Sequence, residues 1–176
     1  MTPATSVLSK CGGGDKSTRR IVFEEVAVTT DRERVRWMGG RQMVGSDSAG
    51  HSIVMDAPAE YKGAGTGARP VEVFLQALGA CTAMDVVSVL EKKRQDFSAV
   101  EIEITGEQRE DEFPKIYTHV DLVYVVRGRS VDPAAVARAV ELSETKYCSV
   151  KGMLGPQVTV TTSYRVEEET APPNKE

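Results

Sequence analysis

Residues 70–94 read PVEVFLQALGACTAMDVVSVLEKKR, and this stretch decides the fold. Pro70 suits the first position of a helix, because its missing N–H would have no partner there anyway. From Val71 to about Arg94 apolar residues occupy nearly every face, which predicts a central helix wrapped by other elements. The basic run at 92–94 suits the C-terminal end, where the helix dipole favours cations. Arg69 is a poor residue for the capping position, which leaves the exact start open.

Alternating apolar and polar residues on both sides of this helix predict strands. Three short strands are expected before it, at the pairs Val26/Val28, Val35/Trp37 and Ile53/Met55. After it we expect two strands, at 100–105 and 120–126. A helix at 134–148, opened by Asp132-Pro133, and a last strand at 158–166 should follow. The order βββ-α-ββ-α-β predicts an α+β fold in which the long helix packs on antiparallel sheets.

The length of 176 residues suits one domain. The two ends of the chain differ from the rest in composition. Residues 1–20 are polar and rich in glycine, and 167–176 are acidic with prolines, so we expect flexible tails around a single domain at 21–166. The net charge of −4 argues against a nucleic-acid partner, whose binder would be basic. No apolar run reaches the ~20 residues of a membrane span, and the N-terminus lacks a secretory apolar segment. We therefore expect a cytoplasmic protein without a membrane partner.

Three cysteines, Cys11, Cys81 and Cys148, are the residues best suited to chemistry. In a reducing compartment such thiols are more often inert, metal-binding or catalytic than part of structural disulfides. The chain has no CxxC or HxxxH, and His51 and His119 stand far apart. Neither a metal site nor a cofactor is therefore expected.

Cys81 lies in the middle of the apolar helix, where a free cysteine is most often a small buried hydrophobe. Asp85 follows one turn later on the same face, and a charged carboxylate there would oppose a thiolate. A reactive Cys81 thus requires a cation from another element. Cys148 lies at the end of the second helix, and its position allows either a role in core packing or a catalytic role. The spacing of the two cysteines does not show that they meet.

Three segments in order carry a resemblance to the OsmC/Ohr family. They are GARPVEVFLQALGACTAMDVVSVLEKKRQ at 67–95, GEQREDEFPKIYTHVDLVYVVRG at 106–128 and ELSETKYCSVKGML at 141–154. The resemblance runs from about Arg34 to Val166. It implies an intertwined homodimer, with two long central helices between sheets built from both chains and two active sites at the interface.

The resemblance also implies a cysteine-based thiol peroxidase. Cys81 would attack an organic hydroperoxide, alkyl or fatty, and the resulting sulfenic acid would condense with Cys148 to a disulfide. An external dithiol, lipoyl-type in this family, would restore both thiols. Apolar residues on the helix suit a fatty substrate, namely Phe74, Leu78 or Met84. Cys11 matches nothing in the family.

One position departs from the best-studied peroxidase branches. They carry a glutamate directly after the proline, paired with an arginine from an early strand that activates the thiol. Here Val71 stands at that position and Glu72 follows, about 100° further round the helix. Arg41, in MGGRQMVG, is the nearest match for the arginine, and Arg109 is a second candidate. Val71 and Asp85 favour an alternative, a non-catalytic dimer that senses redox state or holds a lipid-like ligand.

Overall fold

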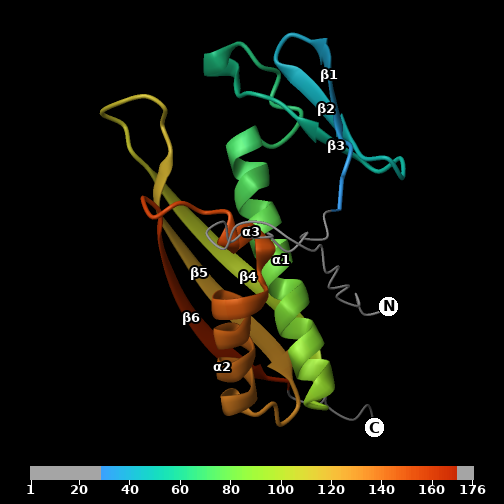
Figure 1. Ribbon diagram of the computed structural model, residues 1–176, viewed down its shortest axis with the longest axis vertical. Coiled ribbons are helices and arrows are strands. Elements are labelled where there is room, and N and C mark those ends of the chain that lie inside the picture. Colours follow the sequence, from blue (N-terminus) through green and yellow to red (C-terminus); the bar gives the residue numbers. More distant parts are fainter. Residues whose placement is uncertain (1–28, 170–176) are drawn as a thin grey trace, which may run out of the picture. The chain divides into compact units, whose positions relative to one another are not determined.

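The computed structural model describes residues 29–169 (Figure 1). The chain divides into two units at Arg32/Glu33, and the second holds every described helix and strand. In chain order these are β1 (Arg34–Gly39), β2 (Gln42–Ser46), β3 (Ser52–Met55), a 3-10 turn (Ala59–Tyr61), α1 (Pro70–Lys92), β4 (Phe97–Gln108), β5 (Tyr117–Gly128), α2 (Pro133–Leu142), a π-helical turn (Ser143–Tyr147), α3 (Ser149–Gly152) and β6 (Thr159–Glu168). The α+β class is confirmed.

The small N-terminal sheet has the order β1-β2-β3 with both pairs antiparallel. The strands expected around Val35 and Ile53 are confirmed as β1 and β3. The pair Val26/Val28 and the tail at 1–20 lie outside the described residues. The central strand β2 was not predicted, because Gly45 interrupts its short sequence QMVGS and leaves no apolar alternation.

The second sheet has the order β4-β5-β6 and is mixed, not antiparallel as predicted. β4 and β5 form a long antiparallel hairpin, but β5 and β6 run parallel. A parallel neighbour requires a crossover connection, and α2 with the segment after it supplies one. β6 also continues to Glu168, so the tail expected from 167 begins inside a strand, where Glu167 binds Arg127 at 2.6 Å.

The core lies between this sheet and the two helices α1 and α2, which cover the same face of it (Figure 1). α1 contributes the fully buried side chains of Leu78, Val86 and Leu90. Gly79 lets α1 approach β4 closely, because a Cβ there would stand 2.4 Å from Ile104 Cδ1. The core therefore fixes the rotation of α1 and hence the direction in which its remaining side chains point.

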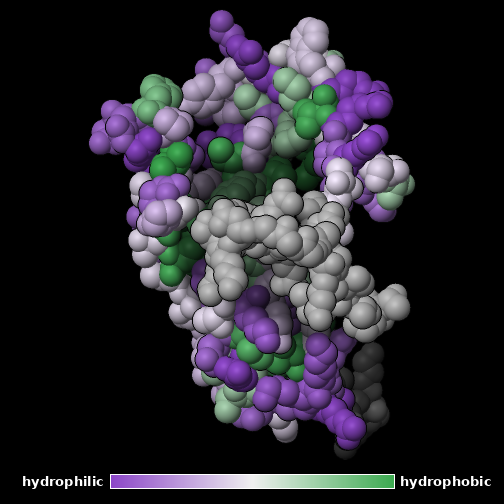
Figure 2. Space-filling model, in the orientation of Figure 1, coloured by the Kyte–Doolittle hydropathy of each residue, from purple (hydrophilic) through white to green (hydrophobic). Residues whose placement is uncertain are grey.

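Within residues 29–169 of one chain, one side of α1 stays uncovered, so the described elements do not wrap the helix all round. The exposed residues form an apolar stripe at helical spacing, Val71, Phe74, Ala77, Ala80 and Met84. Other large apolar side chains are also open to solvent (Figure 2). By length and composition alone, α1 could also cross a membrane. Core helices of soluble proteins meet the same two criteria. A third of the most apolar 18-residue stretch of α1 is buried in this structure.

Asp56 organises the loop between β3 and α1. Its buried carboxylate accepts hydrogen bonds from the backbone amides of Ala57, Ala64 and Thr66. It also accepts a 2.7 Å hydrogen bond from the Thr66 hydroxyl. These bonds, led by that of the Thr66 hydroxyl, hold the pKa of Asp56 below its ordinary 3.8. The loop thus fixes the start of α1 with a charged group that must stay ionised.

Replacement of Asp56 by asparagine is expected to destabilise the protein at neutral pH and to matter less in acid. A carboxyl with a lowered folded pKa stabilises above its unfolded pKa, and that contribution is lost as the pH falls through the folded pKa. The difference in unfolding free energy between wild type and Asp56→Asn should therefore shrink as the pH falls below 3.8. Urea denaturation at pH 7 and pH 3 measures this, and a difference independent of pH would contradict it.

Candidate functional site

Cys81, Asp85 and Cys148 form a cluster in the described chain. α1 presents Cys81 and Asp85 on one face, one turn apart, and Cys148 reaches them from the segment after α2. The two Sγ atoms and an Asp85 carboxylate oxygen all lie within 4.8 Å of one another. Cys148 is buried and the other two residues are partly exposed. A single chain therefore brings together two thiols that are 67 residues apart in the sequence.

Cys148 follows the end of the second helix, as predicted, and it also begins the short helix α3. α2 ends at Leu142, and the π-helical turn delivers Cys148 in an extended conformation, with φ −67° and ψ 101°. The Cys148 N–H donates to Ser143 O at 3.1 Å, and the Lys151 N–H donates to Cys148 Sγ at 3.4 Å. Single π turns are frequent at functional sites, and here one brings the Cys148 thiol toward α1.

Burial and neighbouring negative groups set the electrostatics of Cys148. Loss of solvent is the main cause that raises the pKa of the Cys148 thiol to about 11, and Cys81 and Asp85 add to it. The Lys151 amide opposes the shift. Asp85 in turn accepts a 2.9 Å hydrogen bond from the buried Ser143 hydroxyl. In the reduced protein Cys148 is therefore a neutral thiol at pH 7.

A polar network behind Cys148 was missed from the sequence. Glu144 accepts a 2.8 Å hydrogen bond from the Tyr124 hydroxyl, and its other oxygen lies 2.6 Å from Lys151 Nζ. Lys151 Nζ also donates to the Glu144 carbonyl at 2.9 Å. Burial is the main cause that raises the pKa of Tyr124, so its hydroxyl stays a donor. Both Glu144 and Lys151 lie in the segment ELSETKYCSVKGML, but a spacing of seven residues alone does not show that they meet.

Glu72 caps α1 and pairs with the residue before the proline. Its carboxylate accepts from the Arg69 amide at 2.8 Å and the Arg69 Nε at 2.9 Å. These bonds hold the pKa of Glu72 below its ordinary value. Glu72 precedes Cys81 by nine residues, about 14 Å along the helix axis. The capping box explains why Arg69 serves as a helix start.

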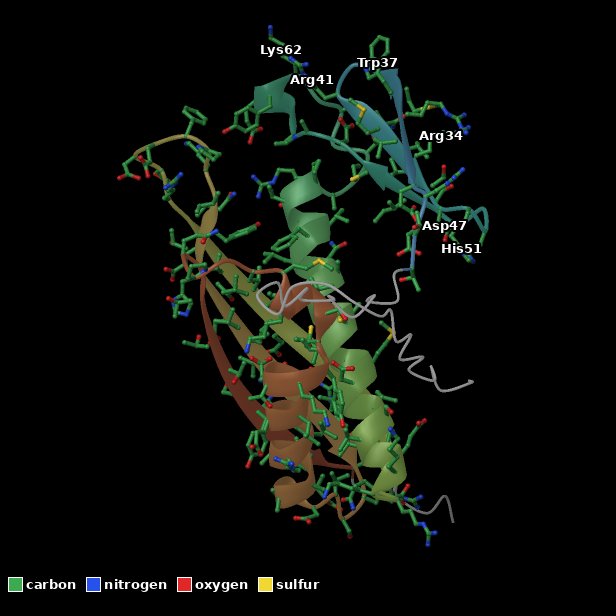
Figure 3. All side chains as sticks on the ribbon, in the orientation of Figure 1. Arg34, Trp37, Arg41, Asp47, His51 and Lys62 are labelled. Atoms are coloured by element: carbon green, nitrogen blue, oxygen red, sulfur yellow. The ribbon has the colours of Figure 1, made fainter. Side chains whose placement is uncertain are left out.

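The two arginines considered as activating groups lie in other parts of the chain, one in a cavity lining and one in a hairpin connection. Arg41 is exposed in the turn between β1 and β2 and lines a cavity with Asp56 and Lys62 (Figure 3). Arg109 donates from Nε to Pro114 O at 2.8 Å and pairs with Glu112, which closes the β4–β5 connection. Among the described residues of one chain, neither is part of the cysteine cluster. Cys11 lies outside the described residues.

Of the apolar residues considered for substrate, Phe74 lines a cavity. The cavity has a volume of about 290 Å³ and also contains Tyr117 and Met153. Phe74 stacks on Tyr117 with ring centroids 6.5 Å apart. Leu78 is fully buried in the core, and Met84 is 67% exposed.

A family model described as OsmC-like protein matches residues 63–163 of the chain. This span covers more than half of the sequence and contains both clustered cysteines. The chain belongs to the OsmC-like protein family. Protein YhfA of Escherichia coli K12 is 46% identical over 133 residues, which make up 76% of this chain and 96% of YhfA.

Solved structures share the fold of this OsmC-like protein. A hypothetical protein from Aquifex aeolicus has a TM-score of 0.71 at 29% identity, covering 81% of this chain and all of its own. The organic hydroperoxide resistance protein OsmC from Legionella pneumophila has a TM-score of 0.57 at 19% identity, covering 78% of this chain and 98% of its own. At that identity the second likeness shows the fold alone.

In this OsmC-like protein Cys148 is expected to react slowly with iodoacetamide at pH 8. With a pKa near 11, against an ordinary 9.0, its thiolate fraction is about 100-fold smaller than that of an unperturbed thiol. Mass mapping of labelled peptides against time and pH, in native and urea-unfolded reduced protein, checks this. Equal native and unfolded rates for Cys148 would contradict the buried thiol.

Proposed function

We propose that this OsmC-like protein is a thiol peroxidase that reduces organic hydroperoxides, with Cys81 as the attacking thiol and Cys148 as the resolving thiol. The observation that carries the proposal is the approach of the two sulfurs, together with Asp85, to within 4.8 Å. The assignment follows exposure, because Cys81 is partly exposed and Cys148 is buried. A peroxide therefore reaches Cys81 first.

The first step is attack of the Cys81 thiolate on the O–O bond. The sulfur bonds to the terminal oxygen, the O–O bond breaks, and the alkoxide takes a proton to leave as an alcohol. The products are Cys81 sulfenic acid and one alcohol. Asp85 lies within reach of the sulfur, so in its acid form it would supply that proton, and as a carboxylate it would accept the thiol proton beforehand.

In the second step Cys148 attacks the sulfur of the sulfenic acid. A disulfide forms, and the sulfenic oxygen leaves as water with the thiol proton of Cys148. The sulfurs must close to about 2.05 Å, so one or both cysteines move toward each other in this step. Its high pKa, raised mainly by burial, keeps Cys148 a neutral thiol that does not compete with Cys81 for the peroxide.

An external dithiol, lipoyl-type or similar, then exchanges with the disulfide. It becomes oxidised while both cysteines return to thiols, which closes the cycle without a bound cofactor. Such recycling needs a reducing compartment, so we place the protein in the cytoplasm. The cavity beside Phe74 and Tyr117 would hold the alkyl part of the peroxide, because its lining is largely apolar.

The proposed enzyme is a homodimer built on the exposed stripe of α1. Uncovered apolar side chains such as Phe74 and Met84 are costly in water, and a second copy would bury them. In this dimer we propose that Arg41 and Glu72 reach the cysteines from the other copy, since within one chain Arg41 lines a cavity that contains neither cysteine and Glu72 pairs with Arg69. This would provide the cation that a Cys81 thiolate needs.

A second candidate function is a non-catalytic dimer that senses redox state or holds a lipid-like ligand. The position of Asp85 favours it, because a carboxylate beside two thiols opposes thiolate formation. In such a protein the Cys81–Cys148 pair would still oxidise, but slowly and without turnover.

Peptide mapping after one equivalent of cumene hydroperoxide tests the proposal. The reduced protein should form a Cys81–Cys148 disulfide within one turnover, and Cys148→Ser should instead keep a Cys81 sulfenic acid that dimedone traps. Steady consumption of peroxide with dihydrolipoamide separates the enzyme from the sensor. Absence of the disulfide would overturn the role of Cys148, and a disulfide without steady turnover would favour the sensor.

A further inference from the structure

We propose that Cys81, Asp85 and Cys148 also form a zinc-binding site with three protein ligands and a water as the fourth. The two sulfurs and the carboxylate oxygen lie within 4.8 Å of one another. Tetrahedral zinc holds such ligands at about 2.0–2.3 Å, which separates them by roughly 3.3–3.8 Å. Closing the cluster therefore needs shifts of about 1 Å, within the range of side-chain rotation.

The donor set selects the kind of ion. Two thiolates bind soft and borderline ions, whereas Mg²⁺ and Ca²⁺ require mainly oxygen ligands in greater number. Two sulfurs with one carboxylate suit Zn²⁺, and three protein ligands leave one position open. Cys81 and Asp85 are partly exposed, so the ion has a route to the buried Cys148.

Two of the proposed zinc ligands, Asp85 and Cys148, each accept a hydrogen bond from a residue that is not itself a ligand. The Ser143 hydroxyl donates to Asp85 Oδ2 at 2.9 Å, and the Lys151 amide donates to Cys148 Sγ at 3.4 Å. Contacts of this kind orient ligands in metal sites and tune their affinity. Zinc binds both sulfurs as thiolates, so binding would release protons and grow stronger as the pH rises.

Zinc and peroxide would compete for the same sulfurs. A bound ion occupies both thiolates, so it would block the attack and the disulfide, and the disulfide in turn leaves no thiolate to bind. The zinc site goes beyond the proposed function and does not depend on it. It departs from the expectation drawn from spacing, because Cys81 and Asp85 come from one helix while Cys148 comes from a distant crossover.

Metal titration of the full reduced chain tests this site in the absence of peroxide. Every protein carries Cys11→Ser, so that the third thiol contributes nothing. Zn²⁺ is titrated against a chromogenic chelator, and Co²⁺ serves as a spectroscopic probe. The variants are Cys148→Ser and Asp85→Asn, with Glu91→Gln as the matched control for loss of one exposed carboxylate on α1.

We expect one zinc per chain, a thiolate-to-cobalt charge-transfer band and intense tetrahedral cobalt bands. Cys148→Ser should lose the charge-transfer intensity of one thiolate, and Asp85→Asn should weaken zinc binding at least about tenfold, while Glu91→Gln leaves it unchanged. Absence of binding, octahedral cobalt spectra, or equal affinity in Asp85→Asn and the control would each overturn the site.

Thermal melting of each apo variant shows that it is folded, and Ser143→Ala, which keeps all three ligands, should weaken binding less than Asp85→Asn. These readouts are independent of turnover, so a failure here leaves the peroxidase proposal standing, and the reverse also holds.

Discussion

Cys81→Ser is expected to lower the rate of organic hydroperoxide reduction by about 10³-fold or more. A serine hydroxyl is a far weaker nucleophile than a thiolate, and loss of a nucleophile removes most of the rate enhancement of an enzyme. Consumption of cumene hydroperoxide with dihydrolipoamide as reductant measures the effect. The substitution is nearly isosteric at a partly exposed position, so the fold should be retained.

The matched comparison is Cys148→Ser, which leaves the attacking thiol in place. One equivalent of peroxide should still be reduced in a single turnover by this variant, while steady turnover falls. If Cys81→Ser retained the activity of wild type, the peroxidase proposal would fail and the sensor would remain. Loss of the first turnover in Cys148→Ser would instead indicate that the roles of the two thiols are exchanged.

Lys151→Met is expected to lower the free energy of unfolding by about 3 kcal/mol and the melting temperature by roughly 6–12 °C. The change removes the cation from a Glu144 carboxylate whose side chain is only 10% exposed, and it leaves that charge with the Tyr124 hydroxyl alone. The value is at the low end for a buried ion pair, because the Lys151 side chain is itself 27% exposed. Urea denaturation and thermal melting measure both quantities.

The control is Lys146→Met, which removes an exposed lysine from the same segment and should cost less than about 0.5 kcal/mol. The double variant Lys151→Met with Glu144→Gln should be more stable than Lys151→Met alone, since it no longer buries an unpaired charge. Equal stability of the two lysine variants would show that the Glu144–Lys151 pair contributes nothing.

Much of the fold followed from local pattern. α1 begins at Pro70 and ends near the basic run because both signals act within one turn of the helix, and the strict alternation at 100–105 predicted β4. The unpredicted parts depend on pairing between distant segments. Nothing local in β6 distinguishes a parallel neighbour from an antiparallel one, and a single glycine concealed β2.

The candidate site was predicted less completely than the fold. The helical spacing of Cys81 and Asp85 correctly put them on one face, but the approach of Cys148 was an implication of the family resemblance. Ser143 and Lys151 escaped notice because a π turn shifts the register of the segment, and helical periodicity carries no sign of such a turn. Contacts made across 58 residues, as between Asp85 and Ser143, lie beyond any local pattern.

The position of Cys148 in the crossover would make the stability of the protein depend on oxidation if the proposed disulfide forms. A covalent link between Cys81 and Cys148 would fasten α1 to the connection between β5 and β6, and so close a ring of nearly 70 residues through the centre of the domain. A ring of that size lowers the entropy of the unfolded chain enough to add about 4 kcal/mol of stability. Molecules that have just met an oxidant would then be the longest-lived, and reduction would return them to a looser state.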